Sequence, residues 1–227
     1  EVLLTRDFQP NVKALLEKAD EHSKIMFLCS PNNPTSNNLN RDSILSLIRQ
    51  FKGIVVLDEA YIDFSETPGL LSELGNYPNL VILQTFSKAW GMAGIRLGLA
   101  FGDSEIIRVL SHIKYPYNIN ILTQQEALNR LSDVSQKDAW IASIKNQREY
   151  LKQELLKLPL VLEILPSEAN FLMVRFENPR EVFDFLTSRK IIVRDRSKVA
   201  LCEGFLRITV GTEAENISVI QNLKAYN

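Results

Sequence analysis

Short apolar segments that end in polar residues recur through the first half of the chain. Each has the length and composition of a β-strand: "KIMFLCS" (24–30), "GIVVLDEAYIDF" (53–64), "NLVILQTFS" (79–87) and "IRLGLAFG" (95–102). Helical patterns or long connections separate them, and Asn40 is a candidate N-cap for the helix in "NRDSILSLIRQF". Strands that are apolar on both faces and separated in this way predict an α/β fold, with a mostly parallel sheet and helices on both faces.

A different pattern begins near Ser135 and predicts a second domain. "AWIASIKNQREYLKQELLKL" carries apolar residues at helical spacing over several turns, which predicts a long helix that bridges two domains. Strand-like and helical segments alternate after it, among them "NFLMVRF", "PREVFDFLTSRK" and "FLRITV". We therefore predict a large domain at residues 1–134, followed by an interdomain helix and a smaller α+β domain at residues 135–227.

The composition argues against several classes of function. The 227 residues include 26 basic and 27 acidic side chains, a balance that indicates neither a nucleic-acid nor a membrane-surface partner. No apolar run reaches the length of a membrane span, and no signal peptide opens the sequence. The two cysteines and the two histidines lack metal-ligand spacing, so no metal site is predicted. These features are typical of a cytoplasmic protein.

Unusual residues lie where three of the predicted strands end, which is the edge at which parallel sheets bind ligands. Asn33 follows the first strand, Asp58 ends an apolar run in the second, and Ser87 and Lys88 follow the third. An ionised Asp58 in a poorly solvated place is costly unless it meets a cation. Taken alone, Asp58 is more simply interpreted as a turn or capping residue, and Lys88 as a surface lysine.

The neighbours of Lys88 favour a more specific interpretation. Thr85, Ser87 and Arg96 supply hydroxyl groups and a guanidinium group, a set that suits a phosphate dianion. A lysine with a reference pKa of about 10.4 becomes a nucleophile only where it is desolvated or lies near another positive charge. The segment therefore predicts a phosphate-bearing ligand beside a functional lysine.

Pyridoxal phosphate has the features that these side chains would recognise. Asn33 and Tyr61 would bond to its phenolic oxygen, and Asp58 would keep its ring nitrogen protonated, so that the ring draws electrons from a bound amino acid. Lys88 would bond to its aldehyde and, once released, act as the base that moves the substrate's proton. The sequence therefore predicts a pyridoxal phosphate site with Lys88, Asp58 and Tyr61 as catalytic residues.

Three motifs resemble a known family. "SPNNPTS", "VVLDEAYIDF" and "TFSKAWGMAGIRLG", in this order and at these separations, resemble the fold-type I pyridoxal-phosphate aminotransferases, and most closely the histidinol-phosphate aminotransferase branch. The resemblance continues through "IIVRDRSK" and "FLRITVGTEAEN" and covers nearly the whole chain. It implies a transamination in histidine biosynthesis. In that reaction, histidinol phosphate and 2-oxoglutarate are converted to imidazole-acetol phosphate and glutamate.

The resemblance also implies roles for individual residues. Arg207 matches the arginine that binds the substrate α-carboxylate, a task that suits a bidentate guanidinium group. Arg194 matches the arginine that helps bind the substrate's phosphate, with a solvated surface charge as the simpler interpretation. Asn170 would help orient the carboxylate, with strand-end capping as the alternative. The family pattern assigns cofactor contacts to Asn33, Asp58, Tyr61, Thr85, Ser87, Lys88 and Arg96.

The chain departs from the family pattern in two ways. Ser36 stands where the common Asn-Pro-Thr-Gly motif has glycine, which is tolerated at a negative φ and costs some strain at a positive φ. Family members also carry an N-terminal portion with a glycine-rich phosphate loop, a stacking aromatic residue and a tyrosine that reaches the partner subunit's cofactor. Because this sequence contains none of these and opens without Met, we expect an N-terminally truncated member.

Other functions remain compatible with the same residues. An aromatic or broad-specificity aminotransferase, or a decarboxylase of phosphorylated threonine, would use the same set. The chain could also be an incomplete, non-catalytic piece that keeps the fold without the cofactor. Family members are homodimers with active sites at the subunit interface, so the resemblance implies a homodimer that acts on small-molecule substrates.

Overall fold

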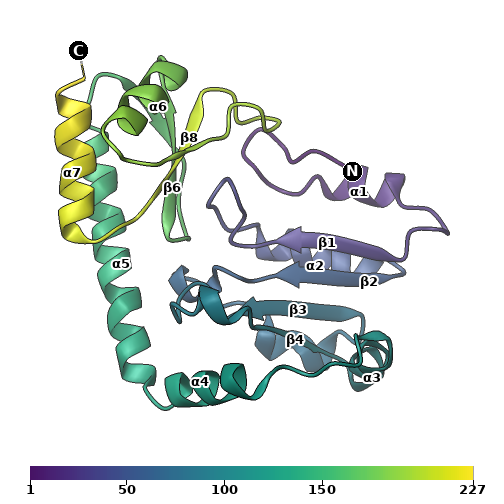
Figure 1. The fold of residues 1–227 in the computed structure, drawn as a ribbon. Coiled ribbons are helices and arrows are strands. Elements are labelled where there is room, and N and C mark those ends of the chain that lie inside the picture. The colour runs from purple at the N-terminus through teal and green to yellow at the C-terminus, as the bar shows by residue number, and fades with distance from the viewer. Residues whose placement is uncertain (227) are drawn as a thin grey trace. The chain divides into compact units, whose positions relative to one another are not determined.

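The computed structural model describes residues 1–226, which form two compact units. The first unit consists of Glu1–Ser30 and Leu39–Trp140, and the second consists of Pro31–Asn38 and the chain from Ile141 onward. Figure 1 labels most of the α-helices and strands of both units. The predicted division into domains at 134/135 stays a prediction.

A four-stranded sheet, in the order β1-β2-β3-β4, forms the centre of the first unit (Figure 1). β1 (Ile25–Cys29), β2 (Ile54–Asp58) and β3 (Leu80–Thr85) run parallel, and β4 (Gly98–Gly102) pairs antiparallel with β3. The connection between β3 and β4 contains only the short 3-10 helix η3 (Ala93–Ile95) and no crossover α-helix, so an antiparallel pairing is the expected geometry. The prediction of an α/β fold with a mostly parallel sheet is confirmed.

One face of this sheet is covered by α2 (Arg41–Gln50), as Figure 1 shows. The side chain of Asn40 accepts a hydrogen bond from the Ser43 amide and caps the helix, as its sequence predicts. Ile44, Leu47 and Ile48 of α2 pack against alternate residues of the strands, among them Leu28 and Leu57. The other helices of this unit are α1 (Val12–Lys18), η1 (Ile62–Phe64), η2 (Leu71–Asn76), α3 (Ser104–Ile113) and α4 (Ile121–Leu131).

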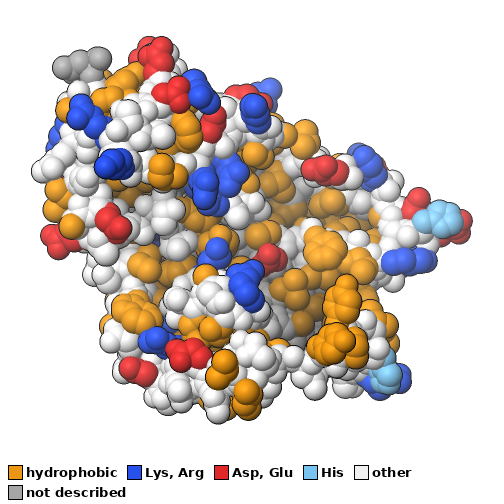
Figure 2. Space-filling model, viewed as in Figure 1, with side chains coloured by type: hydrophobic (Ala, Val, Ile, Leu, Met, Phe, Trp, Pro, Cys, Tyr) orange, Lys and Arg blue, Asp and Glu red, His pale blue; other side chains and the backbone are white. Residues whose placement is uncertain are grey.

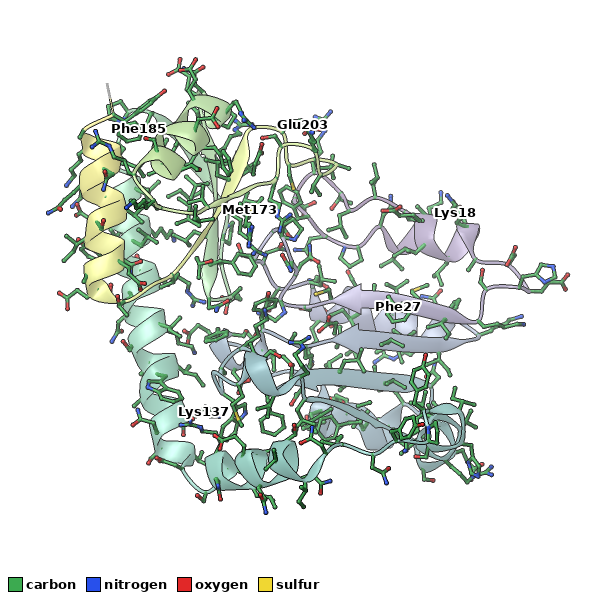
Figure 3. The ribbon with its side chains drawn as sticks, in the orientation of Figure 1. Lys18, Phe27, Lys137, Met173, Phe185 and Glu203 are labelled. Carbon is green, nitrogen blue, oxygen red and sulfur yellow. The ribbon has the colours of Figure 1, made fainter. Side chains whose placement is uncertain are left out.

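The opposite face of β1 is exposed in the part of the chain that the structure describes. Ile25 and Phe27 alternate with the buried Met26 and Leu28, and Phe27 is 70% exposed. Figure 3 labels Phe27 on β1, and Figure 2 shows the apolar side chains that gather over this part of the first unit. The strand is therefore apolar on both faces, as predicted, but only one face lies in the core of this unit.

The second unit contains an antiparallel sheet of four strands in the order β5-β6-β8-β7. Figure 1 labels its central strands β6 and β8. Its strands are β5 (Val161–Ile164), β6 (Phe171–Phe176), β7 (Arg194–Asp195) and β8 (Phe205–Thr209). The core of this unit joins β6 and β8 to three helices, α5 (Val134–Leu155), α6 (Pro179–Ser188) and α7 (Glu213–Lys224).

The long helix predicted from apolar spacing is α5, whose Leu151 and Leu155 are fully buried in this core. None of the helices within residues 1–226 combines the length and the apolar character that crossing a membrane requires.

Candidate functional site

Asp58 is the last residue of β2 and is half-buried. Its Oδ1 atom accepts a hydrogen bond from the Ala60 amide at 2.9 Å, which is the turn contact that the simpler interpretation expects. Within residues 1–226, its carboxylate forms no ion pair. A half-buried carboxylate of this kind is suited to a cationic ligand group.

Lys88 and Tyr61 are brought together by the structure, although the sequence separates them. The Nζ atom of Lys88 lies 5.1 Å from the centroid of the buried Tyr61 ring, which is a cation–π distance. In the part of the chain that is described, this half-buried ammonium group has neither a hydrogen bond nor an ion pair. Lys88 therefore has a half-buried amine beside an aromatic ring, and no carboxylate among the described residues neutralises its charge.

The loop that carries Lys88 is fixed by its flanking residues. Phe86 and Met92 are buried together with Ala127 of α4, and the Met92 amide donates to the Phe86 carbonyl at 3.0 Å. Gly91 closes the turn at φ 68°, and its amide donates to the Lys88 carbonyl at 3.0 Å. Two buried apolar anchors on either side therefore set the position of Lys88.

A second lysine connects the loops of Tyr61 and Lys88. The Nζ atom of Lys137, labelled on α5 in Figure 3, lies 3.5 Å from Asp63 Oδ1 and 5.1 Å from the centroid of the Trp90 ring. Asp63 is two residues after Tyr61, and Trp90 is two residues after Lys88. Lys137 thus connects the loop that contains Tyr61 to the loop that contains Lys88 through its contacts with Asp63 and Trp90.

Thr85 and Ser87 form a hydrogen-bonded turn at the end of β3. The Ser87 amide donates to Thr85 Oγ1 at 3.0 Å, and Thr85 Oγ1 donates to the Leu97 carbonyl at 3.3 Å. Within the described residues, the Ser87 hydroxyl forms no hydrogen bond. Arg96 has a left-handed backbone at φ 55°, and its exposed guanidinium group donates to the Ala93 carbonyl at 2.9 Å. The structure therefore pairs the two hydroxyl residues, while Arg96 bonds within its own turn.

The predicted substrate residues lie in the second unit, and so does Asn33. Arg207 Nη1 donates to Asn33 Oδ1 at 2.8 Å, a contact between residues 174 positions apart. The Arg207 guanidinium carbon also lies 4.9 Å from the centroid of the Phe171 ring. Arg194 is exposed and directly opposite Arg207 across β7 and β8, so two cationic side chains share one face of the sheet. The pair is suited to an anion.

Asn170 lies just before β6 and is half-buried. Its backbone carbonyl accepts a hydrogen bond from the Val210 amide at 2.9 Å. The backbone contact extends the pairing of β6 with β8 and agrees with the alternative of a strand-end position.

Ser36 has the positive φ at which the family's glycine would be unstrained. Its φ is 67° and its side chain is fully buried. The hydroxyl oxygen lies 2.6 Å from the Thr35 carbonyl oxygen and 3.1 Å from the Pro166 carbonyl oxygen, so these two acceptors share its single proton. The Ser36 carbonyl accepts from the Glu168 amide at 2.8 Å. The hydrogen bonds of the serine offset the strain of its left-handed backbone.

The structure adds a buried carboxyl group that the sequence analysis did not single out. Glu59 follows Asp58 and is only 2% exposed, and burial raises the pKa of its side chain. Its Oε1 atom accepts from the Leu70 amide at 2.6 Å and its Oε2 atom from Gln84 Nε2 at 3.1 Å. The available signal was a second acidic residue directly after Asp58, at the end of a strand whose other residues are apolar.

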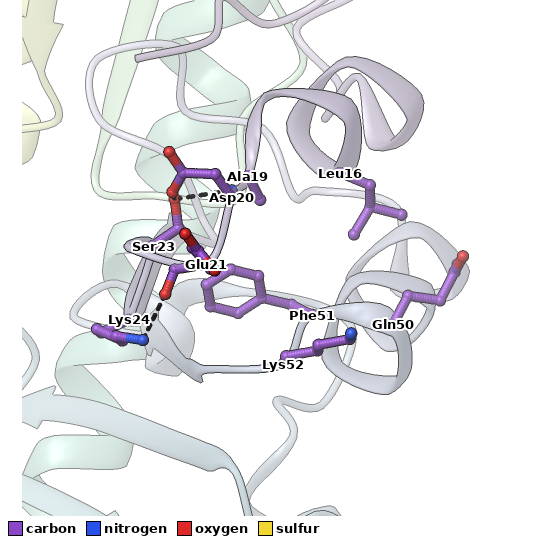
Figure 4. A pocket seen from close by; sticks show the side chains of 9 residues that line it. All are labelled: Leu16, Ala19, Asp20, Glu21, Ser23, Lys24, Gln50, Phe51 and Lys52. Atoms are coloured by element: carbon purple, nitrogen blue, oxygen red, sulfur yellow. Dashed lines mark hydrogen bonds between the residues drawn. The ribbon is translucent and has the colours of Figure 1, made fainter.

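A pocket of about 570 Å³ lies at the other end of the first unit's strands (Figure 4). It includes Lys24 and Lys52, which precede β1 and β2, so it opens at the amino ends of the strands. Two of its polar side chains bond within the segment 20–24: Ser23 Oγ donates to Asp20 Oδ1 at 2.9 Å, and Lys24 Nζ donates to the Glu21 backbone carbonyl. None of the predicted site residues lines it, so it does not replace the cluster at the carboxyl ends.

Comparison with known proteins decides the family. The sequence profile described as "Aminotransferase class I and II" matches residues 2–223. The histidinol-phosphate aminotransferase of Cytophaga hutchinsonii is 53% identical over 225 residues, which are 99% of this chain and 65% of that protein. The chain belongs to the class I and II aminotransferases. It spans 65% of the length of this curated relative.

Solved structures of aminotransferases have the same fold. The histidinol-phosphate aminotransferase of Clostridium acetobutylicum has a TM-score of 0.90 at 25% identity, covering 98% of this chain and 69% of that one. The enzyme of Sinorhizobium meliloti, solved in complex with pyridoxal-5'-phosphate, has a TM-score of 0.87 at 22% identity, covering 100% of this chain and 64% of that one. The family resemblance found in the sequence motifs is confirmed.

Proposed function

We propose that this aminotransferase-family chain provides most of the active site of a histidinol-phosphate aminotransferase. The reaction would convert histidinol phosphate and 2-oxoglutarate into imidazole-acetol phosphate and glutamate, as a step of histidine biosynthesis. The observation that carries the proposal is the half-buried Lys88 amine, without a carboxylate partner in the described residues and 5.1 Å from the Tyr61 ring. The 53% identity to the Cytophaga hutchinsonii enzyme supports the choice of reaction.

The donor set of the first unit fits pyridoxal phosphate. When bound, this cofactor supplies an aldehyde and a ring that withdraws electrons from the substrate. The chain offers an amine on Lys88, a carboxylate without an ion pair on Asp58, and a Ser87 hydroxyl without a hydrogen bond, all at or just after the ends of β2 and β3. Thr85 and Arg96 would complete the contacts to its phosphate.

Each residue of this set has a role that its chemistry supports. Lys88 would hold the cofactor through its Nζ atom and would later move the proton at the substrate's Cα atom. Asp58 would stabilise a positive charge on the ring nitrogen, because its carboxylate is half-buried. The Tyr61 hydroxyl would donate to the phenolic oxygen, and its ring would orient the Lys88 side chain.

The second unit offers the groups that would bind the substrate. Arg207 would bind the α-carboxylate in a bidentate manner and Arg194 the phosphate, with Asn170 orienting the carboxylate. Because Asn33 Oδ1 already accepts from Arg207, the Asn33 amide nitrogen is the atom that would donate to the phenolic oxygen.

The molecular context is part of the same proposal. The partners would be small molecules, and the protein would act as a homodimer in the cytoplasm. Family resemblance supports the homodimer. We also propose the division into a cofactor-binding domain at 1–134 and an interdomain helix with a small domain at 135–227.

A kinetic comparison of amino donors tests the proposed reaction. With pyridoxal phosphate and 2-oxoglutarate present, histidinol phosphate should give a kcat/KM at least about tenfold above that of phenylalanine. A preference for phenylalanine would favour an aromatic or broad-specificity enzyme instead. Release of carbon dioxide from phosphorylated threonine would favour the decarboxylase. Absence of turnover with every donor would favour the incomplete, non-catalytic piece.

A further inference from the structure

Glu59 lies between two residues of the proposed cofactor site, Asp58 and Tyr61, and its backbone is fixed on both sides. The Glu59 amide donates to the Leu83 carbonyl of β3 at 2.8 Å, and the Glu59 carbonyl accepts from the Ile62 amide at 3.0 Å. The first contact continues the pairing of β2 with β3 beyond the last paired residue of β2. The second closes the turn that contains Tyr61.

The Glu59 carboxyl group joins two further segments. Its Oε1 atom accepts from the Leu70 amide at 2.6 Å, and its Oε2 atom accepts from the Gln84 side chain at 3.1 Å. Leu70 ends the loop that begins after Glu59, and Gln84 precedes Thr85 on β3. One carboxyl group therefore connects the segments that carry Asp58, Tyr61 and Thr85.

The loop at residues 60–70 passes close to this carboxyl group at Gly69. A Cβ atom built on Gly69 would lie 2.5 Å from Glu59 Oε1 and 2.6 Å from Oε2, so no side chain fits there without displacing one of them. The close approach lets the Leu70 amide reach the carboxyl group. The bond between Glu59 and the Leu70 amide thus depends on glycine at position 69.

Each carboxyl oxygen of Glu59 accepts a hydrogen bond from within the chain, one from the Leu70 amide and one from the Gln84 side chain. Burying a carboxyl group removes its hydration and costs free energy that hydrogen bonds only partly return. A buried aliphatic side chain would avoid that cost, but it could not accept from a backbone amide and a side-chain amide in two different segments. The carboxyl group therefore differs from an aliphatic side chain in fixing the Leu70 amide and the Gln84 side chain relative to each other.

We propose that Glu59 is a positioning residue that holds the loop 60–70 against β3 and thereby orients Asp58, Tyr61 and Thr85. That these three residues bind the cofactor rests on the proposed function. The contacts that orient them are those of the structure. Glu59 touches neither cofactor nor substrate in this account and acts through its neighbours.

Two substitutions of Glu59 separate position from charge. Glu59→Gln keeps an acceptor for the Leu70 amide, and its own amide can donate to Gln84 once the Gln84 amide turns over. Glu59→Ala removes both contacts and leaves the Leu70 amide and the Gln84 side chain unpaired. Glu105→Ala, on the exposed surface of α3, is a matched control that removes an equal side chain from the same unit.

Two measurements read the effect in the unmodified chain and in these three variants. Hydrogen exchange of the Leu70 amide, without cofactor, reads the position of the loop. Binding of pyridoxal phosphate, followed by the pH dependence of its visible absorption and by borohydride trapping on Lys88, reads the orientation of the site. Glu59→Ala should raise the exchange rate of the Leu70 amide at least about tenfold and weaken the binding of pyridoxal phosphate at least about tenfold. The pH midpoint of the cofactor's visible absorption should also shift in this variant. Glu59→Gln and Glu105→Ala should stay within about threefold of the unmodified chain.

The outcomes distinguish this inference from the proposed function. If Glu59→Ala keeps the exchange rate at Leu70, or binds the cofactor with unchanged affinity and spectrum, the positioning role is wrong. If the unmodified chain traps no cofactor, the proposed function fails, while the exchange rates still decide whether Glu59 holds the loop. Should Glu59→Ala not fold, Gly69→Ala displaces the same loop with Glu59 present and is expected to reproduce both effects.

Discussion

Individual side chains in this chain often hold positions that their residue type alone would not favour. Ser36 and Arg96 have left-handed backbones without being glycine, and Glu59 is a buried carboxyl group. Each such residue has compensating contacts that the structure identifies: two carbonyl acceptors for Ser36, the Ala93 carbonyl for Arg96, and two amide donors for Glu59. Local strain and desolvation of this kind are common near functional sites.

Ser36 allows a direct comparison of strain and hydrogen bonding. Ser36→Ala loses the bonds to the Thr35 and Pro166 carbonyls and keeps the unfavourable φ, whereas Ser36→Gly loses the same bonds but relieves the strain. We expect Ser36→Ala to be less stable than Ser36→Gly by about 1 kcal/mol. Urea unfolding of the two variants measures the difference, and an alanine variant as stable as the glycine variant would contradict it.

The stability of the first unit should depend on pH through Glu59. Burial raises the pKa of this carboxyl group above its ordinary value of 4.5, while the charge of Arg41 and the two amide donors oppose the shift. The folded state then favours the protonated form, so its contribution to stability is full below pH 4.5 and is lost as pH rises through the raised pKa. Glu59→Gln cannot ionise, and its stability relative to the unmodified chain should rise across that window. Urea unfolding at several pH values measures this, and a difference that stays constant with pH would refute it.

Removal of the Arg194 side chain should weaken the binding of phosphorylated amino donors more than that of unphosphorylated ones. It is exposed and opposite Arg207 across two strands, so its removal leaves the contact between Arg207 and Asn33 in place. We expect Arg194→Ala to raise KM for histidinol phosphate by about 10–100-fold and to leave KM for phenylalanine within about threefold. Equal losses for both donors would place Arg194 outside the phosphate site.

At the scale of elements, apolar runs predicted the four strands of the first unit, and apolar spacing predicted α2 and the long helix α5, whereas α1, α3 and α4 were not predicted. Each of the four predicted strands in the first half contains an observed one, and Asn40 caps α2 as expected. The antiparallel direction of β4 could not be read from composition, because it depends on the geometry of the β3–β4 connection. The bond between Arg207 and Asn33 could not be predicted either, since no local pattern relates residues 174 positions apart.

The alternation of β1 makes a prediction about packing. Leu28 is buried against α2, whereas the neighbouring Phe27 is 70% exposed on the other face of the same strand. Leu28→Ala should therefore destabilise this chain by about 2–5 kcal/mol, and Phe27→Ala by less than about 1 kcal/mol. Chemical denaturation of both variants measures this, and a larger loss for Phe27→Ala would mean that the exposed face is covered in solution.

At the scale of the whole molecule, two hydrophobic cores support two sets of residues to which we propose functions. The core of the first unit fixes the strand ends that carry Asp58, Thr85 and Lys88, and the core of the second unit fixes β7 and β8 with Arg194 and Arg207. The chain spans 65% of the length of its curated relative, so the activity of the whole protein is a proposal that needs a direct test.

Covalent trapping on Lys88 tests the central claim most directly. The chain would be incubated with pyridoxal phosphate, reduced with borohydride, digested and examined by mass spectrometry, with Lys88→Ala and, as a control on the exposed surface of the first unit, Lys13→Ala as parallel samples. We predict one cofactor per chain, attached at Lys88, absent from Lys88→Ala and retained by Lys13→Ala. Attachment spread over several surface lysines, or equal labelling of Lys88→Ala, would contradict the account.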